Sequence, residues 1–384
     1  MHYRRFGKTG LMTSVFTLGG MRFIPPNVDT EQMHAVVRRA LELGINHIET
    51  ARGYGPSEEL LGGMMHELPR EDLIITTKIG LTDSDETMWR YINESLERLK
   101  VSWIDNFDYH GINLPEHLEL VKRPDGCRRA VERAVSRGLI RHVGFSTHGP
   151  LEVILDSVNS GMFESVNLHY YYFNQRNRAA VERAAELDMG IFIISPADKG
   201  GQLFAPPATL SALTAPLHPL VFNQRWLLGV HPHVHTLSFA PSFVDEFEPH
   251  LAGFDLDGPL TPAEEEILAR VERQFEVLGP TYCKACWECL PCPEGITIPE
   301  ALRLRNLAVA FDMVGFGSYR YKMFENAADW YPGNKADKCT RCGDCLPRCP
   351  ERLDIPTLLF QTHDMLSTDE QGRRLFAEKD KNTD

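Results

Sequence analysis

Eight of the nine cysteines in this sequence fall in two short runs, and their spacing points to metal chemistry. In the first run each thiol stands three residues after the one before, and a proline follows the last. The second run has intervening gaps of two, two and three residues and also ends in proline. Thiolates gathered in this way are metal ligands more often than disulfide partners. The runs are CKACWECLPCP, with Cys283, Cys286, Cys289 and Cys292, and CTRCGDCLPRCP, with Cys339, Cys342, Cys345 and Cys349.

The spacing of the second run is that of bacterial ferredoxins with two clusters. Three thiolates two residues apart can wrap one iron–sulfur cubane, whereas a zinc ion usually takes two separated pairs. The flanks CPEGITIPEAL (292–302) and CPERLDIPTLL (349–359) repeat each other, each with a proline seven residues after its cysteine. Residues 275–365 therefore resemble helical ferredoxin-like domains that carry two [4Fe–4S] clusters. Two zinc knuckles are the alternative.

The resemblance also implies how the ligands are shared. In two-cluster ferredoxins the fourth cysteine of each run ligates the other cluster. By that logic Cys349 completes the cluster of the first run, and Cys292 completes the cluster of the second. The lone Cys127 lies in a helical pattern away from both runs, and we expect it to be a buried structural thiol.

Short apolar runs alternate with helical patterns over the first 250 residues. Eight strand–helix units predict an α/β fold of the (β/α)₈ TIM-barrel type over residues 1–257. A doubly wound sheet is the alternative, but no GxGxxG motif follows the first strand. A mainly α-helical iron–sulfur domain is expected over residues 258–384, opening with a helix that Thr261 and Glu264 would cap. The predicted strands are 14–20, 46–50, 73–78, 104–110, 140–146, 165–171, 190–195 and 234–239.

The segment IETARGYGPSEELLG (48–62) follows the second predicted strand, where barrels place their chemistry. With the N-terminal YRRFGKTGLMTSVFTLGGMRF and the strands ending TTK and DYH, it resembles the aldo-keto reductases over residues 1–252. The resemblance implies that Tyr54 is the proton donor, Lys78 its partner and His110 the residue that orients a carbonyl. Glu49 stands where the family has an aspartate that holds the lysine.

The chemistry of these residue types agrees with that assignment. A phenol has a pKa near ~10, so it donates a proton poorly at neutral pH unless a cation stabilises the phenolate. A buried lysine supplies that cation, and a carboxylate keeps the lysine charged. Glu49 keeps the charge of aspartate but is longer by one methylene group, so the geometry of the ion pair is expected to differ. Singly, each residue could be structural.

The resemblance further implies a nicotinamide cofactor, NADP or NAD. Ser146, Thr147 and Asn167 stand at predicted strand ends where the family contacts the carboxamide. Ile194 precedes Ser195 where family members usually have a tyrosine, and Ser242 is expected to cap a helix at the phosphate-binding loop. No Lys or Arg occurs between Trp226 and Ala269, so preference for NADP over NAD is questionable.

The composition limits the partners. The net charge of −13 argues against nucleic acid and anionic membrane surfaces, and no apolar run is long enough to span a bilayer. The basic start MHYRRFGKTG lacks an apolar signal region, so we expect a cytoplasmic protein. The predicted function is an oxidoreductase acting on a small carbonyl or alcohol, with clusters that exchange electrons with a partner protein. The alternative is an electron-transfer or redox-sensing protein whose barrel binds a ligand without hydride transfer.

Overall fold

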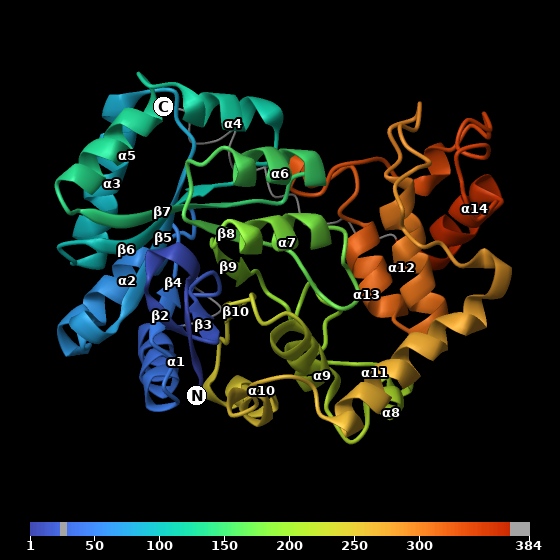
Figure 1. Cartoon of the computed structure of the whole chain (residues 1–384), viewed down its shortest axis with the longest axis horizontal. Coiled ribbons are helices and arrows are strands. Elements are labelled where there is room, and N and C mark those ends of the chain that lie inside the picture. The colour runs from blue at the N-terminus through green and yellow to red at the C-terminus, as the bar shows by residue number, and fades with distance from the viewer. Residues whose placement is uncertain (24–28, 369–384) are drawn as a thin grey trace. The chain divides into compact units, whose positions relative to one another are not determined.

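The computed structural model describes residues 1–23 and 29–368 (Figure 1). Its chain divides into two compact units. One unit contains residues 1–200 and 220–260, and the other contains residues 201–219 and the chain from Thr261 onward.

The first unit is built on a closed barrel of eight parallel strands, so the predicted fold class is confirmed. Neighbouring strands pair in the order of the sequence, and the last pairs with the first to close the barrel. An antiparallel pair, β1 (Tyr3–Arg5) and β2 (Met12–Ser14), precedes it. Each predicted strand segment overlaps one barrel strand, and only β5 extends beyond its predicted segment. The strands are β3 (Phe16–Gly19), β4 (His47–Glu49), β5 (Ile74–Gly80), β6 (Ile104–His110), β7 (Ile140–Ser146), β8 (Ser165–Leu168), β9 (Gly190–Ile193) and β10 (Thr236–Phe239).

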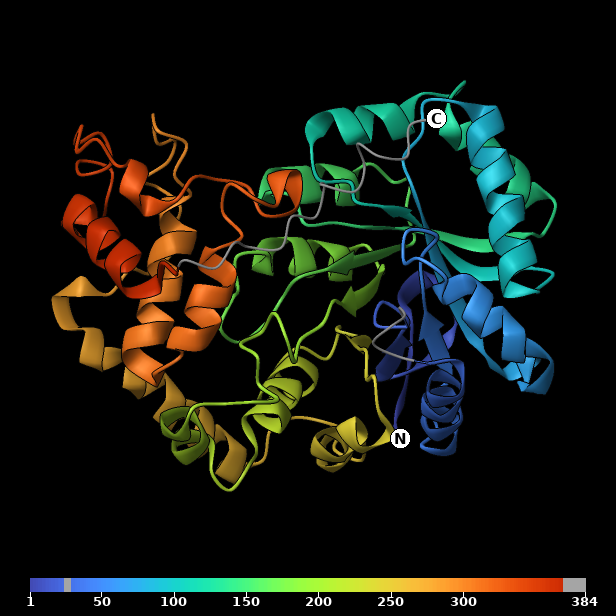
Figure 2. The same cartoon turned by 180° about the vertical axis from the view of Figure 1, so that it is seen from behind.

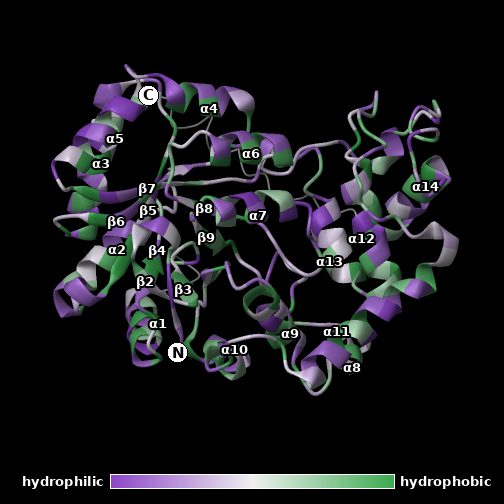
Figure 3. Ribbon diagram, in the orientation of Figure 1, coloured by the Kyte–Doolittle hydropathy of each residue, from purple (hydrophilic) through white to green (hydrophobic). Residues whose placement is uncertain are grey.

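Amphipathic helices lie outside the strands, as the view from behind also shows (Figure 2). In α1 (Thr30–Glu42), Met33, Val36 and Val37 are buried against the barrel, and the Asp29 side chain caps the N-terminus. The helices carry both hydrophobic and hydrophilic residues, as a one-sided contact with the core requires (Figure 3). The others are α2 (Ser57–Met64), α3 (Asp85–Leu99), α4 (Pro115–Lys122), α5 (Cys127–Ser136), α6 (Leu151–Asn159), α7 (Arg178–Glu186), α9 (Pro219–Arg225) and α10 (Glu248–Phe254).

The inside of the barrel is polar at the level of β4. The His47 ring bridges Thr17 and Thr76, with nitrogen–oxygen distances of 2.7 Å to each hydroxyl. Because side chains alternate along a strand, Glu49 lies on the same inner face as His47, one step nearer the C-terminal end. The barrel therefore positions its candidate catalytic layer above a hydrogen-bonded floor.

The second unit is helical. Its helix α11 (Pro262–Gln274) begins with the capping box that the sequence predicts, formed by Thr261 and Glu264. Helix α12 (Ile298–Phe311) packs against α13 (Val314–Tyr321) and α14 (Ile355–Leu366), and 12 of its 14 residues are buried, so it forms the centre of the unit. The unit also contains α8 (Ala208–Thr214).

Short helical turns connect these elements. None of the helices in the described ranges is long and apolar enough to cross a membrane. The 3₁₀ turns are η1 (Gly7–Thr9), η2 (Met65–Glu67), η3 (Arg70–Asp72), η5 (Val244–Phe247), η6 (Phe275–Thr281), η7 (Ala328–Trp330) and η8 (Ala336–Lys338), and η4 (Trp226–Val230) is a π-helical turn.

Candidate active site and cysteine cavities

The barrel brings the four candidate catalytic residues together. Glu49 ends β4, Lys78 lies on β5, His110 ends β6, and Tyr54 lies on the loop after β4. The Glu49 carboxylate forms an ion pair with the Lys78 ammonium, so the longer side chain does reach the lysine. The Tyr54 hydroxyl donates to Glu49 Oε1 at 3.3 Å, and Lys78 Nζ lies 4.9 Å from the centre of the tyrosine ring. The rings of Tyr54 and His110 meet edge to face, 5.7 Å apart.

Burial governs the protonation of this group. It raises the pKa of Tyr54 above its ordinary value, and the charge of Asp108 raises it further, so the phenol is held in its protonated form. Burial also lowers the pKa of Lys78 to about 7, against the opposing effect of Asp108. A protonated phenol beside a lysine that titrates near neutrality suits proton transfer to a substrate oxygen.

Sequence reasoning missed Asp108. This buried residue lies on β6 directly across from Lys78 in the strand register. The signal was available in the alternation of β6, because Asn106, Asp108 and His110 share one face.

The candidate ligands for the nicotinamide carboxamide differ in whether their polar side-chain atoms already have hydrogen-bond partners in the protein. Buried Asn167 Oδ1 receives no hydrogen bond from any residue in the described part of the chain. Ser146 Oγ accepts from the Gly111 N–H at 3.2 Å. Thr147 Oγ1 donates to Ile112 O at 2.7 Å and accepts from the Gly149 N–H at 3.0 Å, so local loop structure uses it. Of the three, Asn167 fits a nicotinamide carboxamide best, because the amide N–H of the carboxamide could donate a hydrogen bond to Asn167 Oδ1.

Two further residues of this region lie near the expected sites. His148 is half-buried, and its ring nitrogen lies 2.6 Å from that of His169. Ser195 follows β9 directly after Ile194, with a φ of 41°, in the left-handed region. His231, His233 and His235 alternate before β10 but do not share a metal site, because the described residues contain no set of three His, Cys, Asp or Glu side chains placed to hold one ion.

The expected helix cap at Ser242 is wrong. The turn η5 begins after Phe243, with no side-chain cap, and α10 begins only at Glu248. The Ser242 N–H instead donates to Glu246 Oε2 at 2.8 Å. The Glu246 carboxylate therefore accepts the hydrogen bond from the Ser242 N–H, in the loop where we expected the cofactor phosphates to bind.

A cation also lies here that sequence reasoning did not find. Arg22, in the turn after β3, forms an ion pair with Glu246 at 3.4 Å. The stretch from Trp226 to Ala269 has no cation of its own, but the barrel brings Arg22 from the far end of the chain. No local pattern could reveal this contact, because it depends on the closure of β10 against β3.

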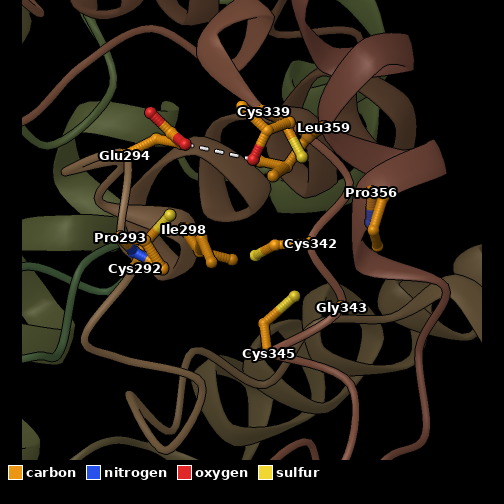
Figure 4. A pocket seen from close by; sticks show the side chains of 11 residues that line it. Cys292, Pro293, Glu294, Ile298, Cys339, Cys342, Gly343, Cys345, Pro356 and Leu359 are labelled. Carbon is orange, nitrogen blue, oxygen red and sulfur yellow. Dashed lines mark hydrogen bonds between the residues drawn. The ribbon is translucent and has the colours of Figure 1, made fainter.

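In the helical unit the eight clustered cysteines line two cavities, four to each. One cavity, with about 320 Å³ of space that includes open solvent, is lined by Cys283, Cys286, Cys289 and Cys349. The other, with about 330 Å³ measured in the same way, is lined by Cys292, Cys339, Cys342 and Cys345 (Figure 4). We call them cavity A and cavity B. Each takes three consecutive cysteines from one run and the fourth from the other, which is the crossed grouping that the resemblance to two-cluster ferredoxins implies.

The repeated flanks build this crossing. In each repeat the cysteine and its proline precede a helix whose second residue is again proline, Pro299 in α12 and Pro356 in α14. Ile298 at the start of α12 lines both cavities. Protein contacts also join the two runs. Lys284 Nζ lies 2.8 Å from Glu351. The Thr340 hydroxyl lies 3.1 Å from Glu294, the contact drawn as a dashed line in Figure 4.

The donor set fits an iron–sulfur cluster better than a single ion. Four thiols face each cavity, with apolar walls that include Leu302 and Leu359. No three of these thiols, nor any other His, Cys, Asp or Glu set in the described ranges, converge on a single metal ion. Burial raises the pKa of Cys289 to about 12, and neighbouring thiols add to that shift. Metal binding at these cysteines must therefore release protons.

Comparison with known proteins matches a family model to each of the two parts of the chain. The model of the aldo/keto reductase family matches residues 16–201, and the model of the 4Fe-4S dicluster domain matches residues 282–353. The chain carries an aldo/keto reductase domain. It also carries a 4Fe-4S dicluster domain, and the two form the combination that the sequence predicts.

Relatives of the aldo/keto reductase domain cover part of the chain. This chain is 29% identical over 215 residues to the uncharacterized oxidoreductase YqkF of Bacillus subtilis. The alignment covers 52% of this chain and 66% of that protein. This chain is 31% identical over 228 residues to L-galactose dehydrogenase of Arabidopsis thaliana, covering 55% of this chain and 66% of that protein. The chain thus spans slightly less than two thirds of each relative.

Solved structures support the fold. The aldo-keto reductase AKR11C1 of Bacillus halodurans superposes with a TM-score of 0.60, covering 70% of this chain and 96% of that one at 22% identity. Identity at this level supports the barrel alone.

Proposed function

We propose that this protein is an oxidoreductase that interconverts a small carbonyl compound and its alcohol with NAD or NADP, and that two [4Fe–4S] clusters relay electrons to or from a partner protein. The observation that supports this proposal most directly is that Tyr54 and Lys78 both contact one carboxylate, that of Glu49, and that the Tyr54 ring packs against His110. In this proposal the barrel domain spans residues 1–257 and the iron–sulfur domain spans residues 258–384.

The proton moves through residues of the chain. The Tyr54 hydroxyl donates to the substrate oxygen, and the Lys78 ammonium stabilises the resulting phenolate. Glu49 keeps Lys78 charged, and His110 donates to the carbonyl oxygen and fixes its orientation. A bound nicotinamide would supply the hydride. In the reverse direction the same phenolate accepts the alcohol proton.

The cofactor would lie along the strand ends. Asn167 and Ser146 are the proposed carboxamide ligands, and unpaired Asn167 Oδ1 supports this. Thr147 and Ser195 line the same stretch, and Ser242 lies where the phosphates are expected. Glu246 would repel a 2′-phosphate, whereas a carboxylate can accept hydrogen bonds from the ribose of NAD.

The crossed cavities support a place for two clusters. Cavity A would take its cluster on Cys283, Cys286, Cys289 and Cys349, and cavity B on the other four cysteines. Each cluster would carry one electron at a time, whereas a nicotinamide transfers two as hydride. This difference is why we infer a one-electron partner. Clusters on free thiols also fit a reducing compartment, and we propose the cytoplasm.

The test is an assay of the anaerobically purified holoprotein. A panel of small aldehydes, ketones and sugars is offered with NADH and NADPH, and nicotinamide oxidation is followed at a fixed enzyme concentration. The proposal expects turnover with a subset of these carbonyl compounds. Nicotinamide binding without turnover on any carbonyl or alcohol would favour the alternative, a redox-sensing protein without hydride transfer.

A further inference from the structure

Asp108 places a second carboxylate beside the proposed catalytic lysine. It pairs in register with Lys78 across β5 and β6, and it is 1% exposed. Its neighbours on the strand, Phe107 and Tyr109, point to the opposite face, where Tyr109 packs against Phe163. Asp108 therefore shares the interior of the barrel with Lys78.

A chain of hydrogen bonds and a glycine surround the Asp108 carboxylate. Asn106 Nδ2 donates to Asp108 Oδ1 at 2.9 Å, and the Ser165 hydroxyl donates to Asn106 Oδ1 at 3.0 Å. Across the next strand pair stands Gly144, where an added Cβ would lie 2.4 Å from Asp108 Oδ1. A side chain at that position would collide with the carboxylate, so the glycine makes room for it.

The charges in this interior do not balance. Glu49 and Asp108 are both buried carboxylates, and Lys78 is a buried cation on β5, the strand between theirs. The other titratable groups facing this space are His47 on β4, Tyr54 on its loop and His110 at the end of β6, while β7 and β8 contribute the neutral Ser146 and Ser165. Burying two carboxylates with one ammonium is costly unless a proton is shared among them.

The pKa directions agree with that count. Burial raises the pKa of Asp108 to about 6, and Lys78 and the Asn106 hydrogen bond oppose the rise. In turn, the charge of Asp108 raises the pKa of Lys78 and that of Tyr54. An ionised Asp108 therefore keeps both proton carriers in their protonated forms.

We propose that Asp108 is a positioning residue that sets the protonation state of Lys78 and with it the upper pH limit of carbonyl reduction. The inference rests on the proposed function for its kinetic consequence, but the titration of Lys78 tests it without any cofactor or substrate. Above pH 6 Asp108 is ionised and supports the ammonium; without that charge, Lys78 loses its proton at lower pH.

The direct experiment is NMR of protein labelled with ¹³C-lysine, in which Lys78→Met assigns the Lys78 signal. Asp108→Asn is expected to lower the titration midpoint of Lys78 by about one pH unit. In the carbonyl-reduction assay, the alkaline limb of kcat/KM should move to lower pH by the same amount, a loss of about tenfold above the limb with little change in KM.

The matched control is Asp105→Asn. Asp105 is also a buried aspartate of β6, but it pairs with Arg70 at 2.8 Å and Arg141 at 3.0 Å. Its loss should reduce stability and leave the Lys78 midpoint in place.

If Asp108→Asn does not fold, Asn106→Ser removes the hydrogen bond that favours ionised Asp108 and should give a smaller shift of the same sign. An unmoved Lys78 midpoint in a folded Asp108→Asn or Asn106→Ser variant, or an equal shift in Asp105→Asn, would overturn the proposal; absence of carbonyl turnover with the midpoint shifted would count against the proposed function alone.

Discussion

The barrel site and the cysteine cavities gather their functional groups by different routes. In the barrel, Glu49, Lys78 and His110 come from three neighbouring strands, and only the closure of the sheet brings them together. In the helical unit, three consecutive thiols of one run line a cavity that the fourth thiol of the other run completes. In the barrel, the strand pairing therefore positions the catalytic groups. In the helical unit, the groups that line the cavities also connect the two cysteine runs to each other.

The largest expected effect concerns the cavities. We expect about eight irons per chain in the holoprotein, four for each cluster. Cys292→Ser combined with Cys339→Ser removes two ligands of cavity B and should leave about four irons. Cys292→Ser combined with Cys283→Ser removes one ligand from each cavity and should damage both clusters. Iron analysis with electron paramagnetic resonance measures the difference.

Cys127→Ser is the control for that pair, because Cys127 is buried on α5 away from both cavities. It should retain the full iron content. If the first double variant lost both clusters while the second kept one, the uncrossed arrangement would hold instead. Zinc in place of iron would remove the cluster proposal.

The next effect is in the barrel. Tyr54→Phe removes the hydroxyl and keeps the ring, so we expect carbonyl reduction to fall by about 10²–10⁴-fold while nicotinamide affinity and iron content stay unchanged. Steady-state kinetics and nicotinamide fluorescence measure the two quantities. Tyr91→Phe, on α3 beside Arg52, is the control and should behave like the wild type. Full turnover in Tyr54→Phe would take this tyrosine out of the mechanism.

The smallest effect concerns the choice of nicotinamide. Glu246 pairs with Arg22 and the Ser242 N–H, so Glu246→Gln removes the charge that neutralises Arg22 and repels a 2′-phosphate, and should tighten NADPH binding by about tenfold. NADH binding should change little. Titration of both nucleotides measures this, with Asp245→Gln as the neighbouring control. A wild-type preference for NADPH of a hundredfold would show that Glu246 does not oppose the phosphate.

How far the sequence could predict these features depends on how local their causes are. The cysteine grouping was predictable because the gaps of two or three residues and the repeated flanks carry a resemblance to two-cluster ferredoxins, and that resemblance implies the crossing. The strands follow from apolar runs, and the capping box at Thr261 follows from residues three apart. These features need no knowledge of distant contacts.

Asp108, Arg22 and Ser242 show where sequence reasoning ended. The role of Asp108 depends on the register between β5 and β6, and Arg22 reaches Glu246 only because β3 and β10 close the barrel. The cap at Ser242 was wrong because the first helical turn, η5, begins at Val244 and so places Phe243, not Ser242, at its N-cap position. The contact of Glu49 with Lys78 was likewise a matter of geometry that the residue type left open.

The most direct test of the account is whether electrons pass between a nicotinamide and the clusters. NADH, and separately NADPH, is added anaerobically to the oxidised holoprotein, and the visible absorption of the clusters is followed together with nicotinamide fluorescence. The account predicts that at least one of the two nucleotides binds and bleaches the cluster absorption. Binding without bleaching, with both nucleotides, would contradict a relay between the barrel and the clusters.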